Sequence, residues 1–185
     1  MKGLVRYAIL SVLLAIAAPA LAADRDSPAA ATKAFYDAYL KAQVRGIPDA
    51  KTRALFTPLI SPALDKLLAD ADAAEQLHFK LTKNEEPPLV EGDPFSSLFE
   101  GATSYRLGKC VEKAEAATCD VELTYAGSSD EKPTHWTDKA VLVKSGGGWL
   151  LDDLNFGATW DFGNKGRMQD LLREVAKYTK EQEAP

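Results

Sequence analysis

The sequence predicts an α+β domain in which N-terminal helices pack on a mainly antiparallel sheet and a last helix follows the sheet. In the first half, apolar residues recur every three or four positions, which is the spacing of a helix face. After residue 102 the pattern changes to alternation, which is typical of strands with one buried side. The chain has 185 residues, 46% of them hydrophobic, which suffices for one core. We therefore expect residues 23–185 to form a single domain.

Residues 1–22 are organised as a signal peptide. Two basic residues, Lys2 and Arg6, precede the apolar run 8–18, and Ala20-Leu21-Ala22 follows as a small-residue cleavage site. An uncleaved anchor is the alternative, although the run is short for a membrane span. Cleavage would remove two basic and no acidic residues, which lowers the formal net charge from −5 to about −7. We expect a periplasmic or secreted protein with no stable membrane insertion and no affinity for nucleic acid.

A first helix is expected to begin after Ser27, a suitable cap, with Pro28 in its first turn, and to close at Gly46. A shorter helix, residues 50–56, should end before Pro58. The apolar face of the first helix is formed by residues at helical spacing: Ala31, Phe35, Ala38, Tyr39 and Ala42.

Ser61 and Pro62 repeat the same start signal for a longer helix. Its apolar stripe, which begins at Leu64, reaches Glu75 and His78 when it is extended by helical steps. Polar residues at the end of such a stripe usually mark the point where a helix emerges into solvent, and we expect this here. A pocket lined by these two side chains is the alternative.

Residues 84–101, NEEPPLVEGDPFSSLFEG, are rich in proline and acidic residues. The regular spacing of oxygen ligands in calcium loops is missing, so we expect no metal site. The segment has enough apolar side chains to pack on the domain instead of forming a linker. They are Leu89, Val90, Phe95, Leu98 and Phe99.

Four strands are expected at residues 103–111, 118–126, 135–144 and 149–154. The only cysteines, Cys110 and Cys119, would reach an oxidising compartment, so we expect a disulfide. A redox-active pair is the alternative, but the chain lacks a Cys-x-x-Cys spacing. Regular alternation would turn Cys110 away from the apolar face that contains Leu107. We therefore predict a bulge near Gly108, which would allow both the disulfide and a common apolar face.

Three glycines, residues 146–148, separate the last two expected strands. A Walker-type phosphate loop needs its lysine and hydroxyl residue after the glycines and a helix behind them. Here Lys144 and Ser145 come first, and a strand follows. The glycines therefore predict a tight hairpin turn.

The last helix is expected to be capped by Asn164 and to pack on the sheet. Docking to another envelope protein is the alternative. Its apolar face comprises Met168, Leu171, Leu172, Val175 and Tyr178. Before it, Asp152 and Asp153 are adjacent strand residues that should point to opposite sides, so they cannot share a proton. We expect both to meet solvent or turn groups.

The hairpin with Lys144, the glycine turn and Trp149 resembles the terminal hairpin of the nuclear transport factor 2-like superfamily, in which helices fill the concave face of a curved sheet. FYDAYL (35–40), LISPALDKLL (59–68) and EGDPF (91–95) resemble an exported bacterial family of unknown function within that superfamily. The resemblance implies a non-enzymatic binding or envelope-accessory module, with an immunity protein against an exported toxin as the alternative. It also implies an envelope protein or a small molecule as partner, and it leaves a homodimer open.

A small enzyme of isomerase or dehydratase type is a further alternative implied by the superfamily. Asp138 shares a strand face with Trp136, so it would point inward and act as a base beside Tyr36 or Tyr39. The preferred interpretation places Asp138 at the open rim, where it meets water or a lysine. Together with His78, these four residues form the predicted pocket. We assign no catalytic residue, metal or cofactor, because the chain has no Gly-x-Ser-x-Gly motif and no metal-pair spacing of histidines.

Overall fold

The computed structural model describes residues 25–128 and 132–183, so the predicted signal peptide lies outside the described residues. The elements are α1 (Pro28–Ala42), α2 (Ala50–Arg53), α3 (Pro62–Thr82), β1 (Ser104–Lys113), β2 (Ala116–Tyr125), β3 (Thr134–Ser145), β4 (Gly148–Asn155) and α4 (Met168–Glu183). Within the described ranges, none of the helices combines the length and the hydropathy that a membrane crossing requires.

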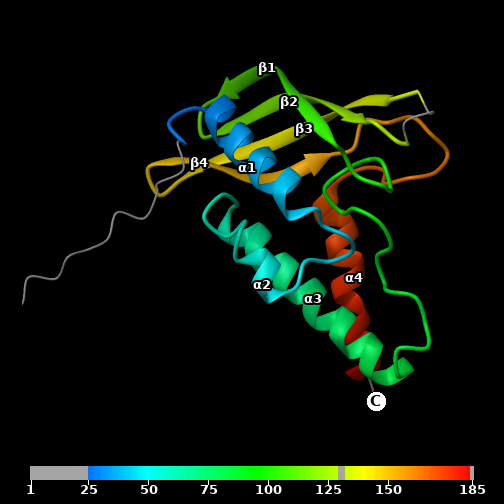
Figure 1. Ribbon diagram of the computed structural model, residues 1–185. Helices are drawn as coiled ribbons and strands as arrows, with labels where there is room; N and C mark the ends of the chain where they lie inside the picture. The colour runs from blue at the N-terminus through cyan, green and yellow to red at the C-terminus, as the bar shows by residue number, and fades with distance from the viewer. Residues whose placement is uncertain (1–24, 129–131, 184–185) are drawn as a thin grey trace, which may run out of the picture.

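The four strands form one antiparallel sheet in the order β1-β2-β3-β4. The sheet is curved, and α1 lies across one of its faces (Figure 1). That face carries alternate residues of each strand, such as Val121 and Leu142, and α1 contributes Phe35 to the same core. The predicted α+β class, with an antiparallel sheet after the first helices and a helix at the end, is confirmed.

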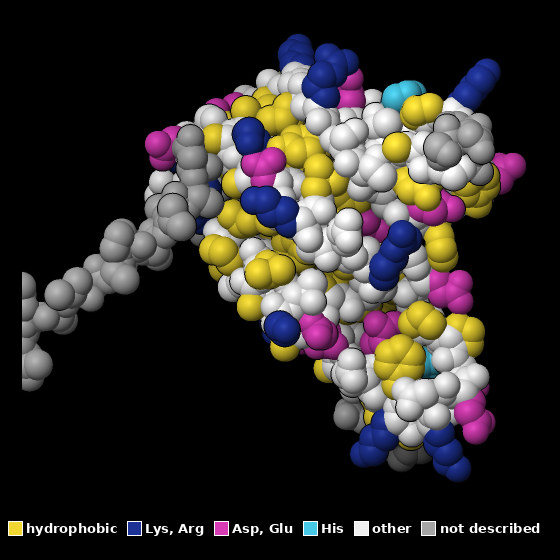
Figure 2. All heavy atoms as spheres, in the orientation of Figure 1, with side chains coloured by type: hydrophobic (Ala, Val, Ile, Leu, Met, Phe, Trp, Pro, Cys, Tyr) yellow, Lys and Arg dark blue, Asp and Glu magenta, His cyan; other side chains and the backbone are white. Residues whose placement is uncertain are grey.

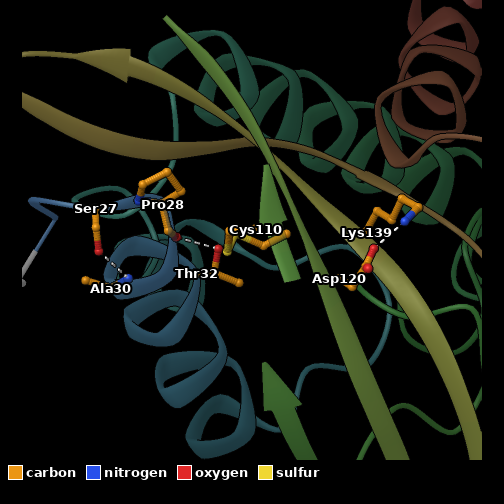
Figure 3. Close-up of a disulfide and its surroundings, with 8 residues drawn as sticks. Ser27, Pro28, Ala30, Thr32, Cys110, Asp120 and Lys139 are labelled. Atoms are coloured by element: carbon orange, nitrogen blue, oxygen red, sulfur yellow. Dashed lines mark hydrogen bonds and ion pairs between the residues drawn. A yellow bond between two sulfur atoms is a disulfide. The ribbon is translucent and has the colours of Figure 1, made fainter. Parts of the chain in front are cut away.

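The β1–β2 hairpin contains the predicted disulfide and the predicted irregularity. Cys110 pairs with Cys119 across the two strands and is bonded to it. The register shifts between Leu107 and Cys110, which brings both residues to the inner face. Figure 3 shows the disulfide beside the first turns of α1, near Thr32. The side chain therefore reaches the core because the strand bulges at Gly108.

The β3–β4 hairpin confirms the glycine turn. Strand β3 ends at Ser145 and β4 begins at Gly148, with Gly146 at φ +59° and Gly147 at φ +83° between them. Positive φ at both central residues is the requirement of a two-residue turn that matches the twist of the strands. This loop has the geometry of a hairpin and not of a phosphate site.

The predicted helix starts are confirmed, whereas two predicted helix ends are wrong. Ser27 Oγ accepts a hydrogen bond from Ala30 N (3.1 Å), and Ser61 Oγ accepts one from Leu64 N (3.0 Å). Helix α1 ends at Ala42 and not at Gly46, because Gln43 adopts the left-handed conformation and its N–H closes the last turn. Helix α2 is shorter than predicted, because the chain after it turns toward the edge of β4, where Leu151 N donates to Leu59 O (3.0 Å).

Helices α3 and α4 both begin beside β4 and run side by side away from the sheet (Figure 1). Helix α4 packs chiefly along α3 and contacts the sheet at β4, so the predicted packing on the sheet holds only in part. Asn164 does not cap α4, because its side-chain amide donates to Asp93 O (2.8 Å) and Ser96 O (2.7 Å). The long segment after α3 returns along this helix pair to the sheet.

Two adjacent acids of β4 hold the starts of these helices. Asp153 Oδ1 accepts from Gln169 N in the first turn of α4 (2.9 Å), and its other oxygen pairs with Arg167 (2.6 Å). Asp152 accepts from Ser61 Oγ, the cap of α3 (2.5 Å). Asp153 is fully buried, so of the two predicted kinds of partner, solvent or turn groups, it meets groups of the segment that follows the strand and not solvent. Negative groups are favourable here because the N-terminus of a helix carries partial positive charge.

Candidate functional site

Glu75 and His78 are buried, with exposed fractions of 5% each, so the predicted emergence into solvent is wrong. Residues 87–90 fold back over α3 and supply partners. His78 Nε2 lies 2.8 Å from Pro87 O, His78 Nδ1 lies 3.2 Å from Tyr178 Oη, and Glu75 Oε1 accepts from Val90 N (3.4 Å). Burial raises the pKa of the Glu75 carboxyl. These contacts place His78 between the two long helices, apart from the sheet residues of the predicted pocket.

Asp138 is fully buried and points inward, so the preferred interpretation of an acid at the open rim is wrong. Residues 96–97 and the segment after β4 cover this end of the inner face. They supply Ser97 N (2.9 Å), Ser97 Oγ and Gly157 N (2.8 Å) as donors to the carboxylate, and Trp136 Nε1 is the fourth (3.0 Å). Asp138 thus ties two loops and a tryptophan to β3.

Asp93, which sequence reasoning missed, forms a second buried acid site with Tyr39. Tyr39 Oη donates to Asp93 Oδ2 (2.6 Å) and accepts from Ala102 N (2.9 Å), while Phe95 N donates to Asp93 Oδ1 (2.7 Å). The backbone at Gly101 comes so close to the Asp93 side chain that only glycine fits there, because a Cβ would lie 2.3 Å from Asp93 Oδ2. Its sequence signal was an Asp between Gly and Pro in EGDPF, a pattern typical of a turn whose side chain binds nearby backbone.

Burial raises the pKa of Asp93 to about 6, although the hydrogen bonds from Tyr39 and Phe95 and the positive charge of Arg45 act in the opposite direction. Burial and the charge of Asp93 also raise the pKa of the Tyr39 hydroxyl, which therefore stays protonated. The tyrosine hydroxyl thus donates a charge-assisted hydrogen bond to the carboxylate in a site that is largely removed from water.

Tyr36 lies close to both buried acids. Its hydroxyl has no hydrogen-bond partner among the residues that the structure describes, although the side chain is fully buried. Burial, followed by the charges of Asp138 and Asp93, raises its pKa well above the ordinary value. Four of the five predicted pocket residues, Tyr36, Tyr39, Trp136 and Asp138, therefore lie around this end of the core, and His78 does not.

A cavity of about 460 Å³ opens at the C-terminal end of α1. Asp93 and Tyr39 lie at its buried side, and Arg45 and Glu100 are exposed on its lining. The remaining lining residues are Leu40, Gln43, Val44, Ala102, Thr103 and Tyr125. In residues 25–128 and 132–183, no group of three His, Cys, Asp or Glu side chains is arranged to hold a metal ion. The face in Figure 2 carries acidic and basic side chains interspersed, without one dominant sign.

The sequence matches no model of a known protein family and no curated protein.

Proposed function

We propose that the chain is an exported, periplasmic or secreted, binding or envelope-accessory module that holds a small polar ligand in the cavity at the end of α1. We also propose that it belongs to the exported bacterial family, within the nuclear transport factor 2-like superfamily, that its motifs resemble. One observation carries the binding role. The cavity places a buried carboxylate–tyrosine pair and an arginine on one lining of about 460 Å³, a volume in the usual range of small-molecule sites.

The hydrogen bonds of Asp138 argue against a role for it as a general base, and so favour a binding module over an enzyme. A general base must reach the proton that it removes, and this carboxylate already accepts four donors in the interior. Asp138 is absent from the lining of the cavity. We assign it the role of an anchor for the loops that shape the site.

An enzyme of isomerase or dehydratase type stays as a second candidate because of Asp93. Its pKa of about 6 is suited to proton transfer near neutral pH, and Tyr39 beside it is a proton donor. An enzyme would lose turnover in Asp93→Asn by at least about a hundredfold, the usual contribution of a general base. A binding module would show no turnover to lose.

The test is native mass spectrometry of the mature protein, purified from its own envelope without a denaturing step. We expect a reproducible small-molecule adduct that is lost in Arg45→Gln and kept in Arg106→Gln. Arg106 is the matched control, because it pairs with Glu122 on the outer face of the sheet, away from the cavity. A bare monomer, or a complex with a second protein alone, would contradict a tightly held ligand. A toxin in that complex would favour the immunity-protein alternative, and a second copy would reveal the homodimer.

A further inference from the structure

We infer that the cavity at the end of α1 selects a small zwitterion, namely an amino acid or a short peptide with a free ammonium and a free carboxylate. This inference rests on the proposed function, since it names the ligand class of the same cavity. It follows from the opposite charges on one lining, with Asp93 at its buried side and Arg45 at its exposed side.

The inner end of the cavity suits an ammonium group. Asp93 uses one lone pair on each oxygen, for Phe95 N and Tyr39 Oη, and a carboxylate has about two more to offer. Glu100, whose side chain is exposed, adds a second negative charge to the lining. The C-terminal end of α1 adds partial negative charge, because the last carbonyls of a helix lack intrahelical partners. A primary ammonium supplies three donors to such a site.

The outer end suits a carboxylate. Arg45 comes shortly after the end of α1 at Ala42, and among the described residues its guanidinium makes no hydrogen bond and no ion pair. It lies near enough to Asp93 to lower its pKa, but the two side chains do not form a salt bridge. The cavity lining therefore carries an arginine and a carboxylate that are not bonded to each other. A guanidinium offers paired donors that match the two oxygens of a carboxylate.

Ligands with one charge fit this lining less well. A simple anion would face Asp93 and Glu100, while a simple cation would leave Arg45 without a partner. A zwitterion satisfies both ends, and Leu40, Val44 and Ala102 offer apolar contacts to a small side chain between them. Specificity of this kind comes as much from the penalty on the wrong charge as from the attraction of the right one.

The inference is tested by titrating the mature protein with dialanine in three forms: free, N-acetylated and C-amidated. Chemical-shift changes in NMR report the affinity. We expect the free dipeptide to bind, and each blocked form to bind at least about tenfold more weakly, because each removes one charge-assisted interaction.

Two variants assign the ends. In Arg45→Gln the free and C-amidated dipeptides should bind equally, whereas the preference over the N-acetylated form remains. In Asp93→Asn the preference over the N-acetylated form should disappear. Arg45 is exposed, so its substitution leaves the core intact, and Arg106→Gln should retain both preferences.

The outcomes separate this inference from the proposed function. Equal binding of all three forms would overturn the zwitterion assignment. An envelope-derived adduct that lacks an amine or a carboxylate, with no dialanine binding, would overturn it as well and would leave the binding role standing. Absence of both an adduct and dialanine binding would overturn the two together.

Discussion

Tyr36 and Tyr39 lie one turn apart on the same face of α1, with ring centroids 5.7 Å from each other, yet only the hydroxyl of Tyr39 has a hydrogen-bond partner in the described part of the chain. Both rings are buried against Phe35. The two residues therefore form a matched pair: a Tyr→Phe substitution removes a hydrogen-bonded hydroxyl at Tyr39 and a hydroxyl without a hydrogen-bond partner at Tyr36.

We expect Tyr36→Phe to be neutral or to stabilise the fold by up to about 1 kcal/mol, because it removes a buried hydroxyl that has no partner. Tyr39→Phe should destabilise it by about 1–3 kcal/mol, because Asp93 and Ala102 N each lose a partner. Urea unfolding of both variants measures the difference. The assignment fails if Tyr36→Phe proves the more costly of the two.

Asp93 should make stability depend on pH in a defined window. Its pKa is about 6 in the folded protein and about 3.9 in an unfolded chain. Between these values the folded state binds more protons, so the free energy of unfolding falls as pH rises from about 4 to about 6. The total effect is at most about 3 kcal/mol.

The check compares the free energy of unfolding of the wild type and Asp93→Asn across that window. Other titrating groups cancel in the difference, which should shift in favour of the variant as pH rises. Parallel curves would show that Asp93 titrates alike in the folded and unfolded states.

Asp138→Asn should destabilise the protein by about 2–4 kcal/mol. The new amide nitrogen faces a donor in either orientation, Gly157 N at the Oδ1 position or Ser97 N and Trp136 Nε1 at the Oδ2 position, and the negative charge that all four donors meet is lost. Asp120→Asn is the control, since Asp120 pairs with Lys139 at the surface, and the loss of this pair should cost less than about 1 kcal/mol. Chemical unfolding, followed by tryptophan fluorescence, compares the two. If Asp138→Asn and Asp120→Asn are equally stable, Asp138 does not anchor the loops.

The disulfide should contribute about 2–3 kcal/mol through loop closure, because the bonded cysteines are nine residues apart. We expect a double Cys110→Ala, Cys119→Ala variant to unfold at lower urea concentration and to lose the response to reductant that the wild type shows. A reductant effect that persists in the double variant would have another origin.

Local features of this fold were predictable from the sequence because neighbouring residues determine them. Ser27 and Ser61 cap the helices that they precede, and the glycine turn needs only its own backbone freedom. Even the bulge at Gly108 followed from one long-range assumption, the disulfide, combined with strand alternation.

The buried acids were not predictable in the same way. Whether Asp138 meets water depends on Ser97 and Gly157, which reach it from 41 and 19 residues away. Glu75 and His78 are likewise covered by residues 87–90. The local pattern predicts that a polar residue on an apolar stripe is exposed, because it does not show which distant segment covers that residue. The burial of these acids was therefore seen only in the structure. Asp93 lies in a loop, and its burial depends on Tyr39 and Gly101, which no local sequence pattern connects to it.

The two acids of β4 also favour one register of the β3–β4 pair. Asp152 is the additional residue where the β3–β4 register shifts, and Asp153 follows it opposite Val141. A strand slipped by one residue would withdraw Asp152 from Ser61 and Asp153 from Gln169 together. Both long helices would then lose a contact with β4 at once. A mispaired hairpin would thus lose contacts outside its own strands, so the pairing of β3 with β4 and the docking of the two helices stabilise each other.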